Sequence, residues 1–139
     1  MRVNPASIEG TLCLAACVAA VLASSAGPAA AQAMTPMRGE VKSYSDRFAV
    51  RVHPMNPYQH RIKVEVKVYD ETFAPVRAAV HPPEAMLAPQ GSRAVLVMVP
   101  FDGRMERKVR ICTEAVPFPG KTQRVRMQVC GRFFASRMQ

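Results

Sequence analysis

The sequence predicts an all-β domain, a seven-stranded antiparallel β-sandwich of the immunoglobulin-like type. Three observations carry this prediction. Short stretches of alternating apolar and polar residues recur through residues 38–134, and a period of two is that of a strand with one buried face. Turn residues separate these stretches at short intervals. None of them has the period of an amphipathic helix, and seven short strands in a domain of this size suit the immunoglobulin-like sandwich.

Three strands are expected in the first half of the domain. A weak one covers residues 38–44, and a second, at residues 47–53, ends where Pro54 and Pro57 remove backbone donors. The third, at residues 61–69, is the clearest, because no helical period fits its pattern. Its apolar Ile62, Val64, Val66 and Val68 alternate with Arg61, Lys63, Glu65 and Lys67.

Four strands are expected in the second half. A short one at residues 76–80 precedes His81-Pro82-Pro83, which cannot join a central ladder. Residues 92–99 are nearly all apolar, as in a strand covered on both faces. The sixth strand covers residues 107–115, and the last covers residues 122–134. Turns are expected at residues 70–72, 87–91 and 101–104, and a hairpin connection at 117–120.

Residues 1–33 are expected to be a secretory signal peptide, which leaves residues 34–139 as the domain. An apolar run at residues 11–25 is followed by Ala31-Gln32-Ala33, the small-x-small form of a cleavage site. The run is too short to span a bilayer, so no stable membrane insertion is expected. The sequence thus predicts a periplasmic protein. A lipoprotein with Cys17 as the lipidated residue is the minor alternative.

The chain is strongly basic, with a formal net charge of +9 and a pI near 10.0. Such a charge favours anionic partners. Nucleic acid is not expected, because the protein would be exported and its aromatic residues form no base-stacking platform. One hypothesis is therefore a basic envelope domain that binds anionic polysaccharide or lipid. Its contact residues would be Arg47, Arg51, Arg61, Lys63 and Lys67.

Cys112 and Cys130 are the cysteines that remain after the expected leader, an even pair in an oxidising compartment. They fall on the last two predicted strands, and sequential strands usually pair. We therefore expect a disulfide that staples this hairpin across its two strands. Since Cys130 shares strand parity with Arg124 and Arg126, the bond should lie on the polar face.

No catalytic or metal site is expected. The domain contains no nucleophile elbow, zinc-protease helix, phosphate loop or CxxC motif. His53, His60 and His81 are scattered and lack the spacing of metal ligands. The sequence therefore predicts a protein that is not an enzyme and needs no cofactor.

The last predicted strand is the candidate binding element. Val125, Met127 and Val129 alternate there with polar residues. This apolar face either packs into the domain's own core or, if the strand lies at a sheet edge, holds a strand of a partner. A purely structural module of a secreted assembly is a third possibility.

Four stretches resemble the N-terminal domain of the periplasmic pilus-assembly chaperones of the chaperone–usher pathway. They are RIKVEVKVYDE, HPPEAMLAPQGSRAVLVM, RKVRICTEAVPF and VRMQVCGRFFASR. The second is similar to the family's PP-x-x-x-L-x-P-x-x-S-x-x-V segment. Its matching residues are Pro82, Pro83, Leu87, Pro89, Ser92 and Val95. The family has two domains with its anchoring cleft between them, and this chain resembles a single-domain version with a short loop before the seventh strand.

The resemblance implies a role for named residues. In the family, an Arg on the first strand and a Lys on the seventh anchor the C-terminal carboxylate of a pilus subunit. Carried over by position, the carboxylate anchors are Arg38 and Arg132. The apolar residues that would complete the subunit's fold by β-strand addition are Val125, Met127 and Val129. The implied function is a chaperone-like domain that binds a secreted or pilus subunit, with a homodimer also possible.

Overall fold

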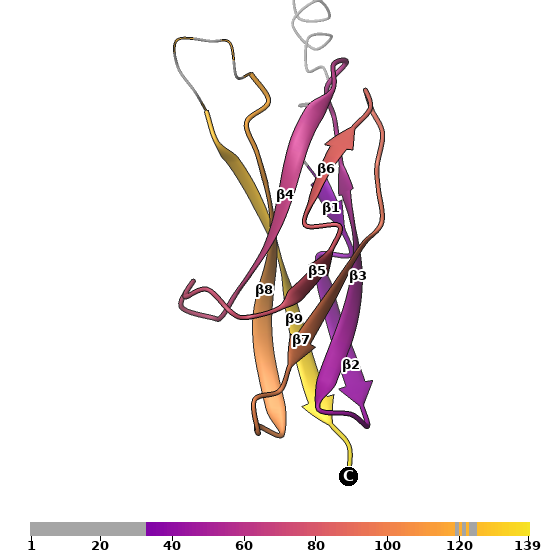
Figure 1. Cartoon of the computed structure of the whole chain (residues 1–139), viewed down its shortest axis with the longest axis vertical. Coiled ribbons are helices and arrows are strands. Elements are labelled where there is room, and N and C mark those ends of the chain that lie inside the picture. Colours follow the sequence, from indigo (N-terminus) through magenta and orange to yellow (C-terminus); the bar gives the residue numbers. More distant parts are fainter. Residues whose placement is uncertain (1–32, 119, 121, 123–124) are drawn as a thin grey trace, which may run out of the picture. The chain divides into compact units, whose positions relative to one another are not determined.

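The computed structural model describes residues 33–118, 120, 122 and 125–139. Within them the secondary structure is all β, and nine strands form two sheets (Figure 1). The strands are β1 (Ala33–Thr35), β2 (Arg38–Ser43), β3 (Arg47–Met55), β4 (Ile62–Tyr69), β5 (Ala79–His81), β6 (Glu84–Leu87), β7 (Val95–Pro100), β8 (Glu106–Ala115) and β9 (Met127–Arg137). None of these residues belongs to a helix long and apolar enough to cross a membrane.

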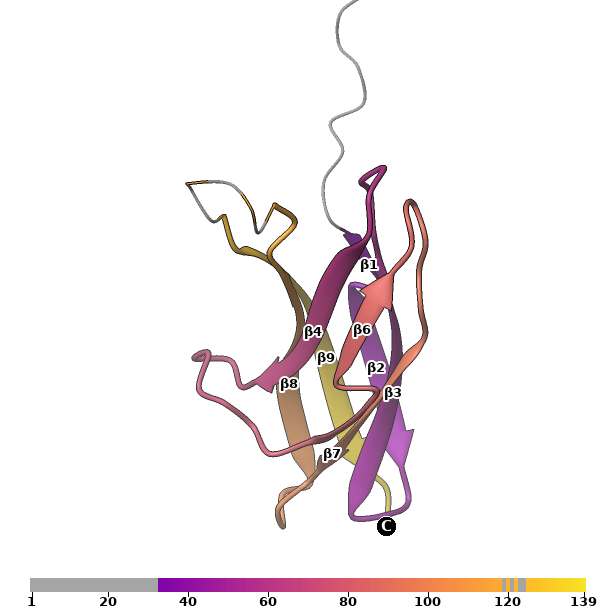
Figure 2. The same cartoon turned by 45° about the horizontal axis from the view of Figure 1, so that its top comes forward.

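The two sheets form the layers of an immunoglobulin-like sandwich. One sheet has the order β1-β3-β7-β5, and the other has the order β2-β9-β8-β4-β6. Figure 2 gives a second view, in which β8, β4 and β9 of the five-stranded sheet lie near one another. Neighbouring strands pair antiparallel, except that β2 pairs with β9 in parallel. The predicted fold class is confirmed.

The strand count differs from the prediction, because two stretches of chain change sheets. β1 belongs to the four-stranded sheet and β2 to the five-stranded one, with Pro36 between them. In the same way, β5 and β6 lie in different sheets on either side of Pro82 and Pro83. Proline cannot donate to a ladder, so each stretch breaks where it crosses over. The sequence predicts neither β1 nor β6.

The last strand is also placed differently. β9 begins at Met127 rather than at residue 122, and Val125 lies before it with 57% of its surface exposed. Arg124, which was expected in this strand, lies outside the described residues. At its other end β9 extends to Arg137, because the parallel pairing with β2 supports it there. The expectation that Val125 belongs to the apolar face of this strand is wrong.

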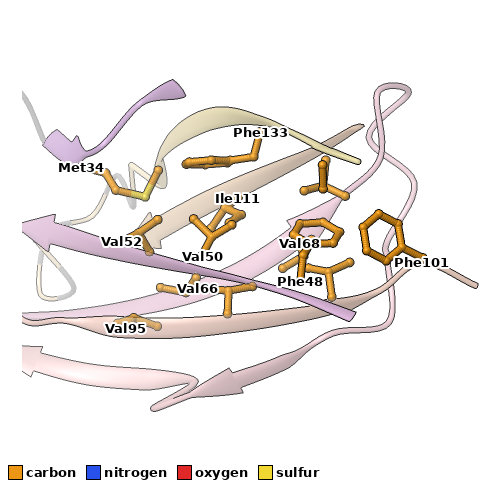
Figure 3. Packing of buried hydrophobic residues seen from close by; sticks show 14 residues of the cluster. Met34, Phe48, Val50, Val52, Val66, Val68, Val95, Phe101, Ile111 and Phe133 are labelled. Carbon is orange, nitrogen blue, oxygen red and sulfur yellow. The ribbon is translucent and has the colours of Figure 1, made fainter. Parts of the chain in front are cut away.

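The core lies between the two sheets (Figure 3). Val50 and Val52 of β3 pack there with Val66 and Val68 of β4, the alternate residues that the sequence marks as apolar. Phe101, predicted as a turn residue, is completely buried. β7 buries only one face fully: Val95, Val97 and Val99 are buried, whereas Leu96 and Met98 are half-buried. The expectation of a strand covered on both faces is therefore only partly right.

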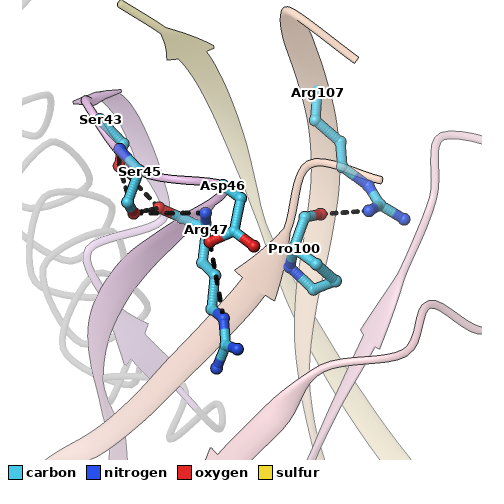
Figure 4. Close-up of polar contacts among 6 residues, drawn as sticks. All are labelled: Ser43, Ser45, Asp46, Arg47, Pro100 and Arg107. Atoms are coloured by element: carbon cyan, nitrogen blue, oxygen red, sulfur yellow. Dashed lines mark hydrogen bonds and ion pairs between the residues drawn. The ribbon is translucent and has the colours of Figure 1, made fainter. Parts of the chain in front are cut away.

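Polar contacts hold the turns at one end of the sandwich (Figure 4). After β2, the hydroxyls of Ser43 and Ser45 both donate to the carbonyl oxygen of Arg47, at 2.6 and 2.7 Å. After β7, the guanidinium of Arg107 donates to the carbonyl oxygen of Pro100. The two serine contacts fix the end of β2, the strand that lies beside β9, and the Arg107 contact joins β8 to the end of β7.

The predicted disulfide is present. Cys112 of β8 and Cys130 of β9 lie directly opposite each other, with their Cα atoms 4.0 Å apart. Cys112 also lies opposite Lys67 of β4, whose side chain points away from the core. The bond is therefore on the outer face of the five-stranded sheet, as expected, and it staples the hairpin that ends in β9.

Candidate functional site

β9 is paired on both sides over only part of its length. β8 pairs with it from Met127 to Ser136, but β2 pairs only with residues 132–137. Residues 127–131, called the open segment below, therefore have no β-strand on their second side in the described part of the chain. An unpaired strand edge is a template for another strand.

The direction of the backbone groups in the open segment follows from its neighbours. The N–H of Arg132 donates to Met37 and the N–H of Met138 donates to Ser43, both at 2.8 Å on the β2 side. Because backbone groups alternate in direction along a strand, those of Gln128 and Cys130 point to the same side. The open segment thus presents two residues whose N–H and C=O groups can bond an added strand.

The apolar side chains of the open segment lie on its inner side. Val129 is half-buried and packs against the core, and Met127 is half-buried at the rim. The hydroxyl of Tyr58 donates to the sulfur of Met127 at 2.9 Å. Of the three residues predicted for a strand-addition face, the structure brings Met127 and Val129 together on β9 and leaves Val125 outside the strand.

The two predicted anchors lie where the open segment ends. Arg38, the first residue of β2, is opposite Arg132 in the parallel register. Arg132 is in turn opposite Arg110 of β8, and Arg110 is opposite Tyr69 of β4. Neighbouring strands are about 4.8 Å apart, so the three arginines form a row across the outer face of the sheet.

These arginines line one shallow depression of about 580 Å³, called the basic groove below. Its lining residues are Arg38, Gly39, Glu40, Glu71, Lys108, Val109, Arg110, Arg132, Phe133 and Phe134. In the described part of the chain, Arg38, Arg110 and Arg132 form no ion pair with a carboxylate. Glu71 is paired with Lys108 at 3.6 Å. The groove therefore carries an excess of positive charge that suits an anion.

Arg110 is fixed in position by the turn between β4 and β5. Its guanidinium lies over the Phe73 ring at 4.5 Å, and its Nη2 donates to the Glu71 carbonyl oxygen at 3.4 Å. The Asp70 carboxylate accepts from the Thr72 hydroxyl and from the backbone N–H groups of Thr72 and Ala74, which lowers the pKa of Asp70. The turn predicted at residues 70–72 thus also positions an arginine of the groove.

A cluster around Glu114 lies on the same face, beside the open segment. The Glu114 carboxylate accepts from Lys67 at 3.0 Å, Tyr69 at 2.8 Å and Gln128 at 3.1 Å. Burial alone would raise the pKa of Glu114, but the hydrogen bonds from Lys67 and Tyr69 outweigh it and hold the pKa below its ordinary value. Because Gln128 belongs to the open segment, this cluster ties that segment to β8 and β4.

The basic residues expected to bind polysaccharide or lipid do not form one surface. Arg47 and Arg51 point outward from β3 in the four-stranded sheet, whereas Lys63 and Lys67 point outward from β4 in the other sheet. Lys63 is paired with Glu84, and Lys67 with Glu65 and Glu114. The basic residues predicted to bind an anionic surface therefore lie on opposite faces of the sandwich, and carboxylates neutralise the charges of the two lysines.

The described residues include no group of three or more His, Cys, Asp or Glu side chains that could hold a metal ion. The features that remain are a strand edge and a basic groove. The strand edge can pair with another strand, and the basic groove suits an anion.

No protein-family model and no curated protein matches the sequence. Solved structures do match, and they place the fold among the PapD-like immunoglobulin-like domains. A PapD-like domain of human CEP192 is 12% identical, with a TM-score of 0.57, and the match covers 100% of this chain and 97% of that one.

Periplasmic pilus chaperones have this same fold. The chaperone SafB of Salmonella enterica, solved in complex with the SafA pilin, is 18% identical with a TM-score of 0.63. The match covers 77% of this chain and 54% of that chain. The periplasmic chaperone SfaE is 11% identical with a TM-score of 0.63, covering 78% and 59%. The chain thus spans little more than half the length of the bacterial chaperones it matches.

Proposed function

We propose that this protein is a non-enzymatic, chaperone-like domain of the periplasm that binds an exported partner, such as a pilus subunit, by β-strand addition to β9. The observation that carries the proposal is the position of the open segment. It is a strand edge with half-buried apolar side chains, and it ends at two arginines, Arg38 and Arg132.

A parallel orientation of the added strand relative to β9 is part of the proposal, and the pairing of β2 supports it. β2 pairs in parallel with β9 and begins at Arg38. A partner strand that adds to residues 127–131 in the same direction would run toward the first residue of β2 and end there. Its C-terminal carboxylate would then meet the guanidiniums of Arg38 and Arg132. A guanidinium binds a carboxylate through two parallel hydrogen bonds, so the pair would fix the register of the added strand.

The apolar side chains supply the second part of the interaction. Met127 and Val129 lie on the inner side of the open segment, where they are only half-buried by the domain itself. An added strand would place further apolar residues beside them and remove the remaining surface from water. Backbone hydrogen bonds would give affinity, and these side chains would select partners with matching apolar residues.

The fold comparison supports this class of function without fixing it, because one fold can carry unrelated functions. Two features favour the chaperone-like role. SafB, which has this fold, was solved with a pilin, and the basic row here lies at the end of the open segment. The division of Arg47, Arg51, Lys63 and Lys67 between two faces speaks against the polysaccharide or lipid alternative.

Co-purification of the tagged protein from the periplasm tests the proposal. We expect Met127→Asp/Val129→Asp to lose a protein partner that the wild type retains, because two charges on the apolar side would oppose strand addition. Leu96→Asp is the matched control, since Leu96 is also a half-buried strand residue but lies on the outer face of the other sheet. A second untagged copy, if recovered, identifies a homodimer. A folded double variant that keeps every partner would refute the proposal.

A further inference from the structure

Arg110 is the arginine of the basic groove that the proposed anchor does not use. Arg38 and Arg132 suffice for one carboxylate, yet Arg110 lies in the same row beyond Arg132 and lines the same depression. We infer that the groove takes two anionic groups at once. They are the C-terminal carboxylate of the partner and the side-chain carboxylate of its last residue, so the partner chain would end in Glu or Asp. This inference rests on the proposed function.

The environment of Arg110 supports a role in binding. Its Nε is buried and has no hydrogen-bond partner among the described residues. Buried donors are almost always paired, and one left alone costs free energy, so this N–H calls for an acceptor. The Phe73 ring and the Glu71 carbonyl oxygen already hold the guanidinium in place. An incoming carboxylate that reaches the half-buried Arg110 side chain would therefore meet a cation whose position is fixed in advance.

The spacing of the row indicates two anionic groups rather than one. β2, β9 and β8 are consecutive in the sheet, so Arg38 and Arg110 stand on strands about 10 Å apart. One carboxylate cannot bridge that distance. A carboxylate at Arg38 and Arg132 and a second at Arg132 and Arg110 would use all three guanidiniums. The two carboxylates of a terminal Glu are separated by a distance comparable to one strand spacing.

The charge of the groove points the same way. Three guanidiniums and Lys108 face two carboxylates, and one of these, Glu71, is already paired with Lys108. The other, Glu40, lies opposite Phe134, two residues along β2 from Arg38. A single carboxylate from the partner would leave this positive charge incompletely balanced, whereas two would compensate it more fully.

Binding of small anions to the whole protein tests the inference. Glutarate, whose two carboxylates resemble those of a terminal Glu, is compared with acetate at constant ionic strength. The ¹⁵N–¹H resonances of the arginine Nε groups report binding. We expect glutarate to shift the Arg38, Arg132 and Arg110 resonances and to bind about tenfold more tightly than acetate, since it gains a further charge-assisted hydrogen-bonded pair.

Two variants separate the role of Arg110 from that of the anchor. Arg110→Gln should bring glutarate affinity close to that of acetate while acetate binding persists. Arg110→Lys keeps the positive charge but loses the planar guanidinium that binds a carboxylate through two hydrogen bonds. Its affinity for glutarate should lie between those of the wild type and Arg110→Gln. Arg51→Gln, on the outer face of the other sheet, should change nothing. Equal affinities for the two anions, or unchanged glutarate binding in folded Arg110→Gln, would overturn this inference alone. Failure of both anions to shift Arg38 and Arg132 would count against the proposed anchor as well.

Discussion

Arg110 and Arg132 lie directly opposite each other on β8 and β9, two residues along each strand from the disulfide pair of Cys112 and Cys130. In an antiparallel pair, residues two apart on both strands share a face. The disulfide thus fixes a register that also places Glu114 opposite Gln128 on the other side of the bond. One covalent bond therefore aligns both the basic groove and the cluster beside the open segment.

Removing the disulfide should destabilise the domain. We expect Cys112→Ala/Cys130→Ala to lose about 3 kcal/mol of unfolding free energy, because the bond closes a loop of 18 residues in the unfolded chain. Urea unfolding in oxidising buffer measures the loss, and the reduced wild type should behave like the double variant. A double variant as stable as the oxidised wild type would show that the chain-entropy argument fails here.

Substitutions at Val125 and Met127 should have very different effects on partner binding. Val125 lies before β9 and is 57% exposed, whereas Met127 is half-buried in the open segment. We expect Val125→Asp to leave co-purification of the partner unchanged and Met127→Asp to reduce it severalfold. Circular dichroism checks that both variants are folded. Equal losses would mean that the interacting strand extends beyond the start of β9.

The sequence predicts the fold well because burial and period agree in the central strands. In β4 the four alternating apolar residues from Ile62 to Val68 are all buried, as their pattern requires. The crossovers could not be predicted in the same way. β1 and β6 are short and adjoin prolines, and they are held by pairing with β3 and β4, which no local sequence pattern predicts.

The site was only partly visible in the sequence. The family resemblance marks Arg38 and Arg132, but nothing local marks Arg110 or Glu114 among the many charged residues. The cysteine pair held the missing signal. Once Cys112 and Cys130 are taken as direct cross-strand partners, the antiparallel register places Arg110 beside Arg132 without further information. No sequence pattern shows that β2 pairs only with residues 132–137 of β9, which is what leaves the open segment without a second neighbouring strand in the described part of the chain.

Stability should depend on Glu114 in a pH-dependent way. The pKa of Glu114 is lowered from its ordinary 4.5, so the folded state favours the ionised form. The resulting stabilisation is fully present above pH 4.5 and is lost as the pH falls through the lower pKa of the folded state. Glu114→Gln should therefore be less stable than the wild type at pH 7, by at least about 1 kcal/mol for the lost charge-assisted hydrogen bonds.

Urea midpoints between pH 7 and pH 3 measure this effect. The gap between wild type and Glu114→Gln should narrow as the medium becomes acidic. Glu106→Gln is a suitable control, because Glu106 is an exposed residue at the start of the same strand. A gap that stays constant over the whole range would mean that Glu114 contributes through packing and not through its charge.

Gly131 is the position where the open segment meets the β1–β2 crossover, and a side chain there should be poorly tolerated. A Cβ at Gly131 would lie 2.9 Å from the Phe133 ring, 3.0 Å from the Met34 side chain and 3.1 Å from the Met37 carbonyl oxygen. Met37 accepts the hydrogen bond from Arg132, so its displacement would disturb the first pairing between β2 and β9. We expect Gly131→Ala to cost about 1–3 kcal/mol of unfolding free energy.

Gly120→Ala, where a Cβ would have no neighbour within 4 Å, is the control. Equal urea midpoints for the two variants would show that the crossover moves freely, and β2 would then not hold Arg38 beside Arg132 firmly enough for a defined anchor.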